Sequence, residues 1–231
     1  MTGWLASITG IDEARQVLAA GASFIDCKNP MAGALGALPA GTVAAVVREV
    51  AGRAPVSATV GDFPDMDPAA VVAAIAAMAE TGVDYVKIGL FPAPNLAACL
   101  AALAAIAGRQ PLVAVLFADR EPDYGLIPRL AELGFAGVML DTAGKSGGGL
   151  LAHLAPPVLA DFVRRARAHG LLTGLAGSLK LADIDRLLPL KPDYLGFRGA
   201  LCREHVRVAG LDPVALAAVA ERLALTDSLV S

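Results

Sequence analysis

Residues 84–119 have the sequence DYVKIGLFPAPNLAACLAALAAIAGRQPLVAVLFAD, and this stretch decides the fold. A short run of β-branched and apolar residues, YVKIGL from Tyr85, is followed by a longer stretch rich in alanine and leucine. A second short run, LVAVLFA from Leu112, comes after it. Strand, helix and strand at this spacing are typical of a βαβ unit, in which the two strands lie parallel.

The same alternation runs through the whole chain. The eight predicted strands are WLASI from Trp4, FIDCK from Phe24, VSATVG from Val56, YVKIGL from Tyr85, LVAVLFA from Leu112, GVMLDT from Gly137, LTGLAGS from Leu172 and YLGFRGA from Tyr194. Eight such units in 231 residues favour an α/β fold with a single (β/α)8 TIM barrel over residues 1–231. A doubly wound open sheet is the alternative, but no G-x-G-x-x-G follows the first predicted strand.

Composition excludes several kinds of partner. The chain has a formal net charge of −3 and no block of basic residues, so we expect no binding to nucleic acid or to anionic membranes. Its apolar runs reach about half of the roughly 20 residues that a membrane span needs. Three isolated cysteines and an N-terminus without a signal peptide favour a cytoplasmic protein. The high apolar content, 56%, is compatible with a homo-oligomer.

Lysine and aspartate side chains gather where the predicted strands end. Asp26 and Lys28 are two residues apart, so they project from the same face of the second strand. Lys87 is in the fourth strand, Asp141 ends the sixth and Lys145 follows it. A barrel has its active site at the carboxyl ends of the strands. A single lysine there is more often salt-bridged than catalytic, but two interior lysines together favour catalysis.

Several lysines in one site indicate a specific chemistry. A lysine nucleophile must be neutral, whereas its ordinary pKa is about 10.4. Neighbouring cations and burial lower that pKa, a second lysine can act as general acid or base, and a carboxylate can move or orient protons. The pattern therefore predicts carbonyl chemistry: imine formation, aldol addition, elimination and dehydration.

The last two predicted strands end in glycine-rich segments, GLAGS (174–178) and GFRGA (196–200). The loops after strands seven and eight are the usual phosphate site of this fold, with backbone N–H groups as donors. Tight barrel bends are the alternative explanation of the glycines, and a structural salt bridge is the alternative for Arg198. The three scattered histidines show no ligand spacing, and we predict no metal site. The predicted substrate-binding residues are Asp119, Gly177, Ser178, Arg198, Gly199 and Ala200.

A set of motifs, in a fixed order, resembles the (5-formylfuran-3-yl)methyl phosphate synthase family of methanofuran biosynthesis. The motifs are FIDCKNP (24–30), GALGALP (33–39), VSATVGD (56–62), DYVKIGLF (84–91), MLDTAGKSGGGLL (139–151), LAGSLK (175–180) and DYLGFRGALC (193–202). The resemblance covers nearly the whole chain. The sequence departs from the archaeal pattern at REPDYG (120–125) and in the glycine-rich loop after Lys145, which suggests a bacterial member of the family that acts in one-carbon metabolism.

The resemblance implies a lyase that condenses two molecules of glyceraldehyde 3-phosphate, loses phosphate and water and closes a furan ring, without a metal or organic cofactor. It implies that Lys28 forms the Schiff base, that Lys87 donates and accepts protons, and that Asp26, Asp141 and Lys145 complete the catalytic set. Two alternatives remain open at this stage. One is a class I aldolase acting on a triose phosphate, and the other is a non-catalytic barrel that binds a phosphorylated ligand.

Overall fold

The computed structural model describes residues 2–144 and 147–230, with side chains described up to residue 225. Within these residues, parallel strands pair in chain order and close into a barrel. The strands are β1 (Gly3–Ile8), β2 (Phe24–Cys27), β3 (Val56–Thr59), β4 (Tyr85–Gly89), β5 (Leu112–Phe117), β6 (Gly137–Asp141), β7 (Leu172–Leu175) and β8 (Tyr194–Phe197). The predicted (β/α)8 TIM barrel is therefore confirmed, and the open sheet is excluded.

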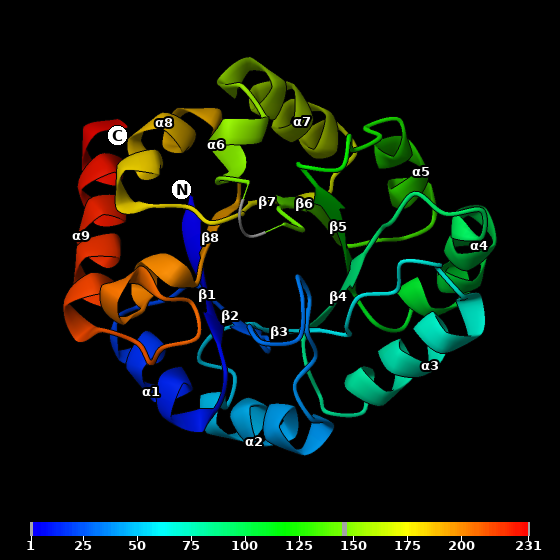
Figure 1. Cartoon of the computed structure of the whole chain (residues 1–231), viewed down its shortest axis with the longest axis horizontal. Helices are drawn as coiled ribbons and strands as arrows, with labels where there is room; N and C mark the ends of the chain where they lie inside the picture. Colours follow the sequence, from blue (N-terminus) through cyan, green and yellow to red (C-terminus); the bar gives the residue numbers. More distant parts are fainter. Residues whose placement is uncertain (1, 145–146, 231) are drawn as a thin grey trace.

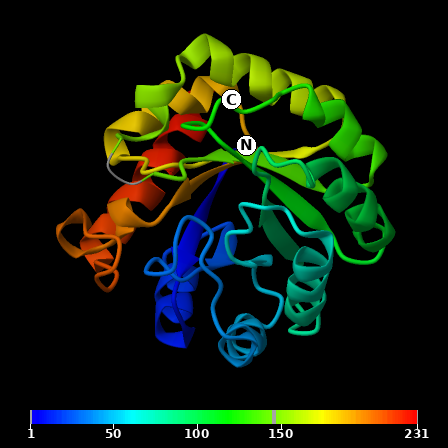
Figure 2. The same ribbon diagram turned by 45° about the vertical axis from the view of Figure 1, so that its right-hand side comes forward.

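Helices surround the barrel on its outside (Figure 1). The α-helices are α1 (Ile11–Ala19), α2 (Ala40–Val50), α3 (Pro68–Ala79), α4 (Leu96–Ala107), α5 (Leu126–Glu132), α6 (Leu150–His153), α7 (Pro156–Ala168), α8 (Ile184–Leu187) and α9 (Pro213–Val230). The 3₁₀ helices are η1 (Leu181–Asp183), η2 (Leu188–Leu190), η3 (Gly199–Leu201) and η4 (Arg203–His205). Helix α9 packs against α8 and β1, so the end of the chain completes the ring next to its beginning (Figures 1 and 2).

Side chains that alternate along each strand pack into two separate apolar cores, one between the sheet and the helices and one inside the barrel. Ile25 and Cys27 of β2 are fully buried between the sheet and the helices. Residues of the opposite parity point into the barrel, where Val115 and Met139 belong to a separate apolar cluster. Because this inner cluster fills the barrel, polar side chains of the same parity are held next to an apolar floor.

Several predicted strands are too long at their carboxyl ends. The sequence predicts that the seventh strand continues to Ser178, but β7 ends at Leu175. Gly177 has φ +109° and Ser178 has φ +50°, and both values lie outside the β region, so the chain leaves the sheet before these residues. The two residues therefore belong to the loop that follows β7, at the mouth of the barrel.

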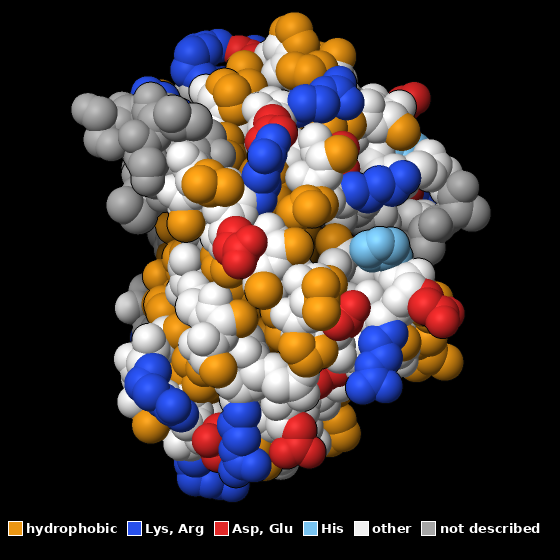
Figure 3. All heavy atoms as spheres, turned by 90° about the vertical axis from the view of Figure 1, so that its left-hand side faces the viewer, with side chains coloured by type: hydrophobic (Ala, Val, Ile, Leu, Met, Phe, Trp, Pro, Cys, Tyr) orange, Lys and Arg blue, Asp and Glu red, His pale blue; other side chains and the backbone are white. Residues whose placement is uncertain are grey.

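The helices, the surface charges and the cysteines can be compared with the predictions about membranes, nucleic acid and cellular compartment. Within the described residues, no helix combines the length and the apolar character that a membrane crossing requires. The face that carries α9 mixes basic, acidic and hydrophobic side chains without one dominant basic area (Figure 3). Cys27, Cys99 and Cys202 are all buried free thiols. The expectations about nucleic acid, oligomeric state and compartment stay predictions.

Candidate active site

A buried lysine–carboxylate pair lies in the floor of the barrel mouth, between β2 and β4. Lys87 Nζ is 3.0 Å from Asp26 Oδ1, and both side chains are almost completely buried. The Asp26 carboxylate also accepts hydrogen bonds from the hydroxyls of Ser57 (2.6 Å) and Ser7 (3.1 Å). Burial lowers the pKa of Lys87, assisted by the charge of Lys28, and the attraction of Asp26 only partly opposes this shift. The buried amine is therefore better suited than an ordinary lysine to accept and return a proton.

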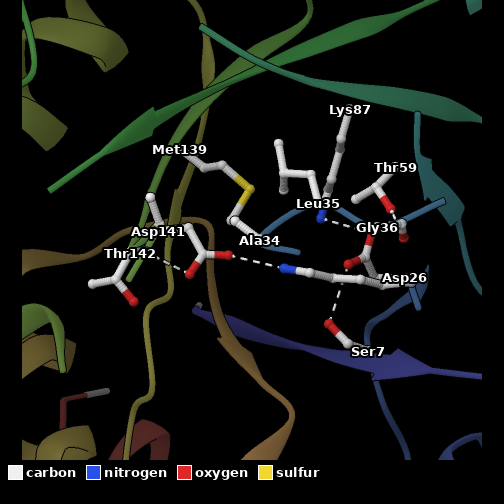
Figure 4. Close-up of polar contacts among 12 residues, drawn as sticks. Ser7, Asp26, Ala34, Leu35, Gly36, Thr59, Lys87, Met139, Asp141 and Thr142 are labelled. Carbon is white, nitrogen blue, oxygen red and sulfur yellow. Dashed lines mark hydrogen bonds and ion pairs between the residues drawn. The ribbon is translucent and has the colours of Figure 1, made fainter. Parts of the chain in front are cut away.

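A second lysine–carboxylate pair lines the same cavity, and its carboxylate, Asp141, lies on the other side of the mouth from Asp26 and Lys87 (Figure 4). Lys28 directly follows β2, and its Nζ lies 3.1 Å from Oδ2 of Asp141 at the end of β6. The other oxygen of this carboxylate, Oδ1, accepts a hydrogen bond of 2.7 Å from the backbone N–H of Thr142. Asp141 is thereby held with one oxygen directed at the lysine, so it is positioned to take a proton from the Lys28 ammonium.

The loop after β2 covers one side of the mouth. Ala34 and Leu35 of this loop are buried in the inner apolar cluster. Both backbone N–H groups donate to the carboxylate of Asp62, at 2.8 and 3.1 Å. A Cβ placed on Gly89 would lie only 2.8 Å from Leu35 Cδ1, so the leucine packs directly on the inner face of β4, two residues beyond Lys87. This leucine therefore closes the β4 side of the mouth above the buried amine.

The mouth that remains open is a cavity of about 900 Å³. Asp26, Lys28, Lys87 and Asp141 all line it, so four of the five predicted catalytic residues share one space. Lys145, the fifth, lies outside the described residues. The remaining lining includes the predicted phosphate-binding loops and part of α9, and the predicted substrate-binding residues among it are Gly177, Ser178, Arg198, Gly199 and Ala200.

Two of the predicted substrate-binding side chains have other partners. All five N–H donors of the Arg198 guanidinium are used: by Glu13 twice and by three backbone carbonyls, those of Ser7, Arg207 and Ala209. This geometry leaves no donor for a substrate, so we correct the predicted role of this side chain to a structural one, which was the alternative.

Asp119 is not among the residues that line the cavity. Its carboxylate accepts hydrogen bonds from the backbone N–H groups of Ala143 (2.8 Å) and Gly144 (2.6 Å). Burial raises the pKa of Asp119, but these two hydrogen bonds, the backbone N–H of Asp119 itself and the charge of His153 together outweigh burial, so the pKa is lowered. The predicted substrate contact is therefore replaced by a positioning role: Asp119 holds the start of the loop after β6, which leads from Asp141 toward Lys145.

Sequence reasoning missed four residues that shape the site. Ser7 and Ser57 hold Asp26, and their signal was a polar residue on the inward-facing parity of an apolar strand. Leu35 and Arg207 also line the cavity, but both come from loops. No local pattern indicates where such loops return to the barrel.

The chain is similar to a family of known proteins over most of its length. A family model described as 4-HFC-P synthase matches residues 4–220. A Methylorubrum extorquens protein, provisionally named (5-formylfuran-3-yl)methyl phosphate synthase, is 48% identical over 95% of this chain and 90% of its own length. The (5-formylfuran-3-yl)methyl phosphate synthase of Methanococcus aeolicus is 36% identical over 86% of this chain and 89% of its own length. The solved phosphoribosyl anthranilate isomerase of Thermotoga maritima has a TM-score of 0.71 at 14% identity, covering 96% of this chain and 98% of that one, which is a likeness of fold alone.

A closed barrel with paired lysine and carboxylate side chains in its mouth defines this molecule as a (β/α)8-barrel enzyme. The chain belongs to the 4-HFC-P synthase family, because the family model spans most of its length and relatives above 30% identity cover more than two thirds of it. The family resemblance seen in the motifs is thereby confirmed.

Proposed function

We propose that this enzyme condenses two molecules of glyceraldehyde 3-phosphate to (5-formylfuran-3-yl)methyl phosphate through a Schiff base on Lys28. The names of the relatives support the product. The observation that carries the proposal is the presence of two lysine–carboxylate pairs, Lys87–Asp26 and Lys28–Asp141, in one cavity. Binding alone needs no such arrangement, whereas imine chemistry needs one amine to react and another group to move protons.

The first step follows from the outer pair. Asp141 takes a proton from the Lys28 ammonium, and the neutral amine attacks the aldehyde carbon of one triose phosphate. The carbinolamine then loses water to form the imine. Lys28 is suited to this role because it lines the cavity and its side chain is more exposed than that of Lys87, 11% against 3%. Lys87 lies deeper and is covered on one side by Leu35.

The later steps need a proton to be removed and returned several times. Lys87 is the proposed acid and base, because burial keeps its pKa lowered and Asp26 fixes its position. The imine nitrogen accepts electrons when a neighbouring C–H bond is broken, so the resulting enamine can add to the second aldehyde. We assign Lys145 to the same proton transfers on the family resemblance.

The proposed reaction balances. Two triose phosphates contain six carbons and two phosphates, whereas the product contains six carbons and one phosphate. One inorganic phosphate and two water molecules therefore leave. We propose that the retained phosphate binds the backbone of the loops after β7 and β8, at Gly177, Ser178, Gly199 and Ala200, which line the cavity.

The imine that Lys28 forms with the substrate is itself the electron sink, so the proposed chemistry requires no metal and no organic cofactor. We further infer a cytoplasmic enzyme, since three buried free thiols suit a reducing compartment. Dialysis against a chelator should leave the activity unchanged, and a loss that added metal restores would contradict this inference.

Product analysis tests the proposal. Purified protein is incubated with glyceraldehyde 3-phosphate, and the near-ultraviolet spectrum and the release of inorganic phosphate are followed together. The proposal predicts a furan absorbance and one phosphate for every two triose phosphates consumed. A sugar bisphosphate without absorbance or phosphate release would indicate an aldolase instead. No turnover at all would indicate a binding protein, and Lys28→Ala serves as the inactive control.

A further inference from the structure

The loop after β8 carries an arginine that the proposed mechanism has not used. Arg207 lines the cavity and is half-buried. Arg198 fixes its backbone, because the Arg198 guanidinium donates to the carbonyls of Arg207 (2.9 Å) and Ala209 (3.0 Å). The side chain of Arg207 thus starts from a well-anchored point of the loop.

The guanidinium of Arg207 reaches across the mouth. A Cβ on Gly199 would lie 4.0 Å from the Cβ of Arg207. The Arg207 side chain therefore begins beside Gly199, the first residue of η3, in the proposed phosphate-binding loop after β8. It ends at the loop after β2, where its Nη2 donates to the carbonyl of Gly33 at 3.3 Å. The strands follow one another around the barrel in the order β7, β8, β1, β2. The Arg207 side chain therefore runs from the loop after β8, past the end of β1, to the loop after β2, which is the side of the mouth where Lys28 lies.

The charge of Arg207 has no carboxylate partner in an ion pair within the described part of the chain, and the bond to Gly33 uses one of its five N–H donors. Burial lowers the pKa of Arg207, while Asp141 raises it, which agrees with a location inside the electrostatic field of the site. A half-buried arginine with open donors toward a cavity is suited to a phosphate, because its planar fork matches two phosphate oxygens.

We propose that Arg207 forms a second phosphate subsite, which binds the phosphate of one triose phosphate while the backbone of the β7 and β8 loops binds that of the other. The inference rests on the proposed function, which brings two phosphates into one cavity and keeps only one in the product. Arg198 and Arg207 then have separate tasks: the first holds the loop, and the second contacts the substrate.

Inorganic phosphate is the probe that tests this subsite, by isothermal titration calorimetry with the whole protein. The wild type should bind two phosphates. In Arg207→Gln, one of the two affinities should fall by roughly 10- to 100-fold, because a charge-assisted contact is lost. Arg207→Lys should lie between the two, since it keeps the charge but not the fork. Arg203→Gln is the matched control, because Arg203 is exposed in the same loop and does not line the cavity.

A wild type that binds a single phosphate, or an Arg207→Gln variant that still binds two with unchanged affinities, would overturn the subsite. Thermal unfolding of each variant shows whether a lost site reflects a lost fold. The result is separable from that of the proposed function. Two phosphate sites without furan formation would leave the subsite standing, and furan formation by a protein with one site would remove only the subsite.

Discussion

Lys87 Nζ lies 3.0 Å from Asp26 Oδ1 at the floor of the cavity, with the two side chains only 3% and 4% exposed. Lys28, by comparison, is 11% exposed and bridges the mouth to Asp141. The two lysines therefore differ in depth, in partner and in access to a substrate. The sequence predicts a lysine of lowered pKa in this site, and burial lowers the pKa of the deeper lysine, Lys87.

Replacing Lys87 should separate imine formation from the later steps. Lys87→Ala keeps Lys28 and Asp141 in place, so borohydride should still trap the triose phosphate on the protein. Furan formation should fall by about 100-fold or more, because proton transfer by a positioned group contributes roughly 10²–10⁴ in rate. Trapping by mass spectrometry and turnover by absorbance are measured on the same preparation. Normal turnover would show that Lys87 is not the acid and base.

Shortening Leu35 should change the pKa of Lys87. Leu35 covers the β4 side of the mouth, so Leu35→Ala admits water and weakens the burial that lowers this pKa. The pKa of Lys87 should then rise toward its ordinary value. The ¹³Cε shift of labelled lysine, followed through a pH titration, measures the change.

The control for this variant is Leu130→Ala, since Leu130 of α5 is fully buried in the outer core. Both substitutions should cost about 2–5 kcal/mol of the free energy of unfolding. Only Leu35→Ala should move the lysine titration. Equal shifts in both variants would mean that general destabilisation, and not local hydration, controls the amine.

Asp119 should contribute to stability at acid pH. Its pKa is lowered in the folded protein, so the folded state keeps this carboxylate ionised at a pH where the unfolded chain has protonated it. The contribution is complete above the ordinary pKa of about 3.9 and is lost as the pH falls through the lowered value. Asp119→Asn should therefore lower the free energy of unfolding more at pH 6 than at pH 2.5. Urea titrations at both values test this, and an equal loss at both would refute the assignment.

The fold could be predicted because strand and helix periods leave different patterns in the sequence. Parity alone also placed Asp26 and Lys28 on one face, and the carboxyl ends of the strands brought Lys87 and Asp141 beside them. These predictions depend only on backbone geometry and on the closure of the barrel. They do not depend on the conformation of the neighbouring loops.

The loops could not be predicted in the same way. Arg198 and Arg207 have the same side chain, and only the folded structure shows that Arg198 uses all its donors for hydrogen bonds to Glu13 and backbone carbonyls. Nothing in the sequence near Leu35 shows that it turns back into the barrel, because Asp62, which holds it there, follows a different strand. The relative depth of the two lysines depends on this same loop.

The central claim is that Lys28 forms the covalent intermediate, and reductive trapping tests it most directly. The protein is treated with borohydride in the presence and absence of glyceraldehyde 3-phosphate, and the modified peptide is mapped by mass spectrometry. We expect a substrate-dependent adduct on Lys28 alone and none in Lys28→Ala. An adduct on Lys87 or another lysine, or furan formation by Lys28→Ala, would contradict the mechanism.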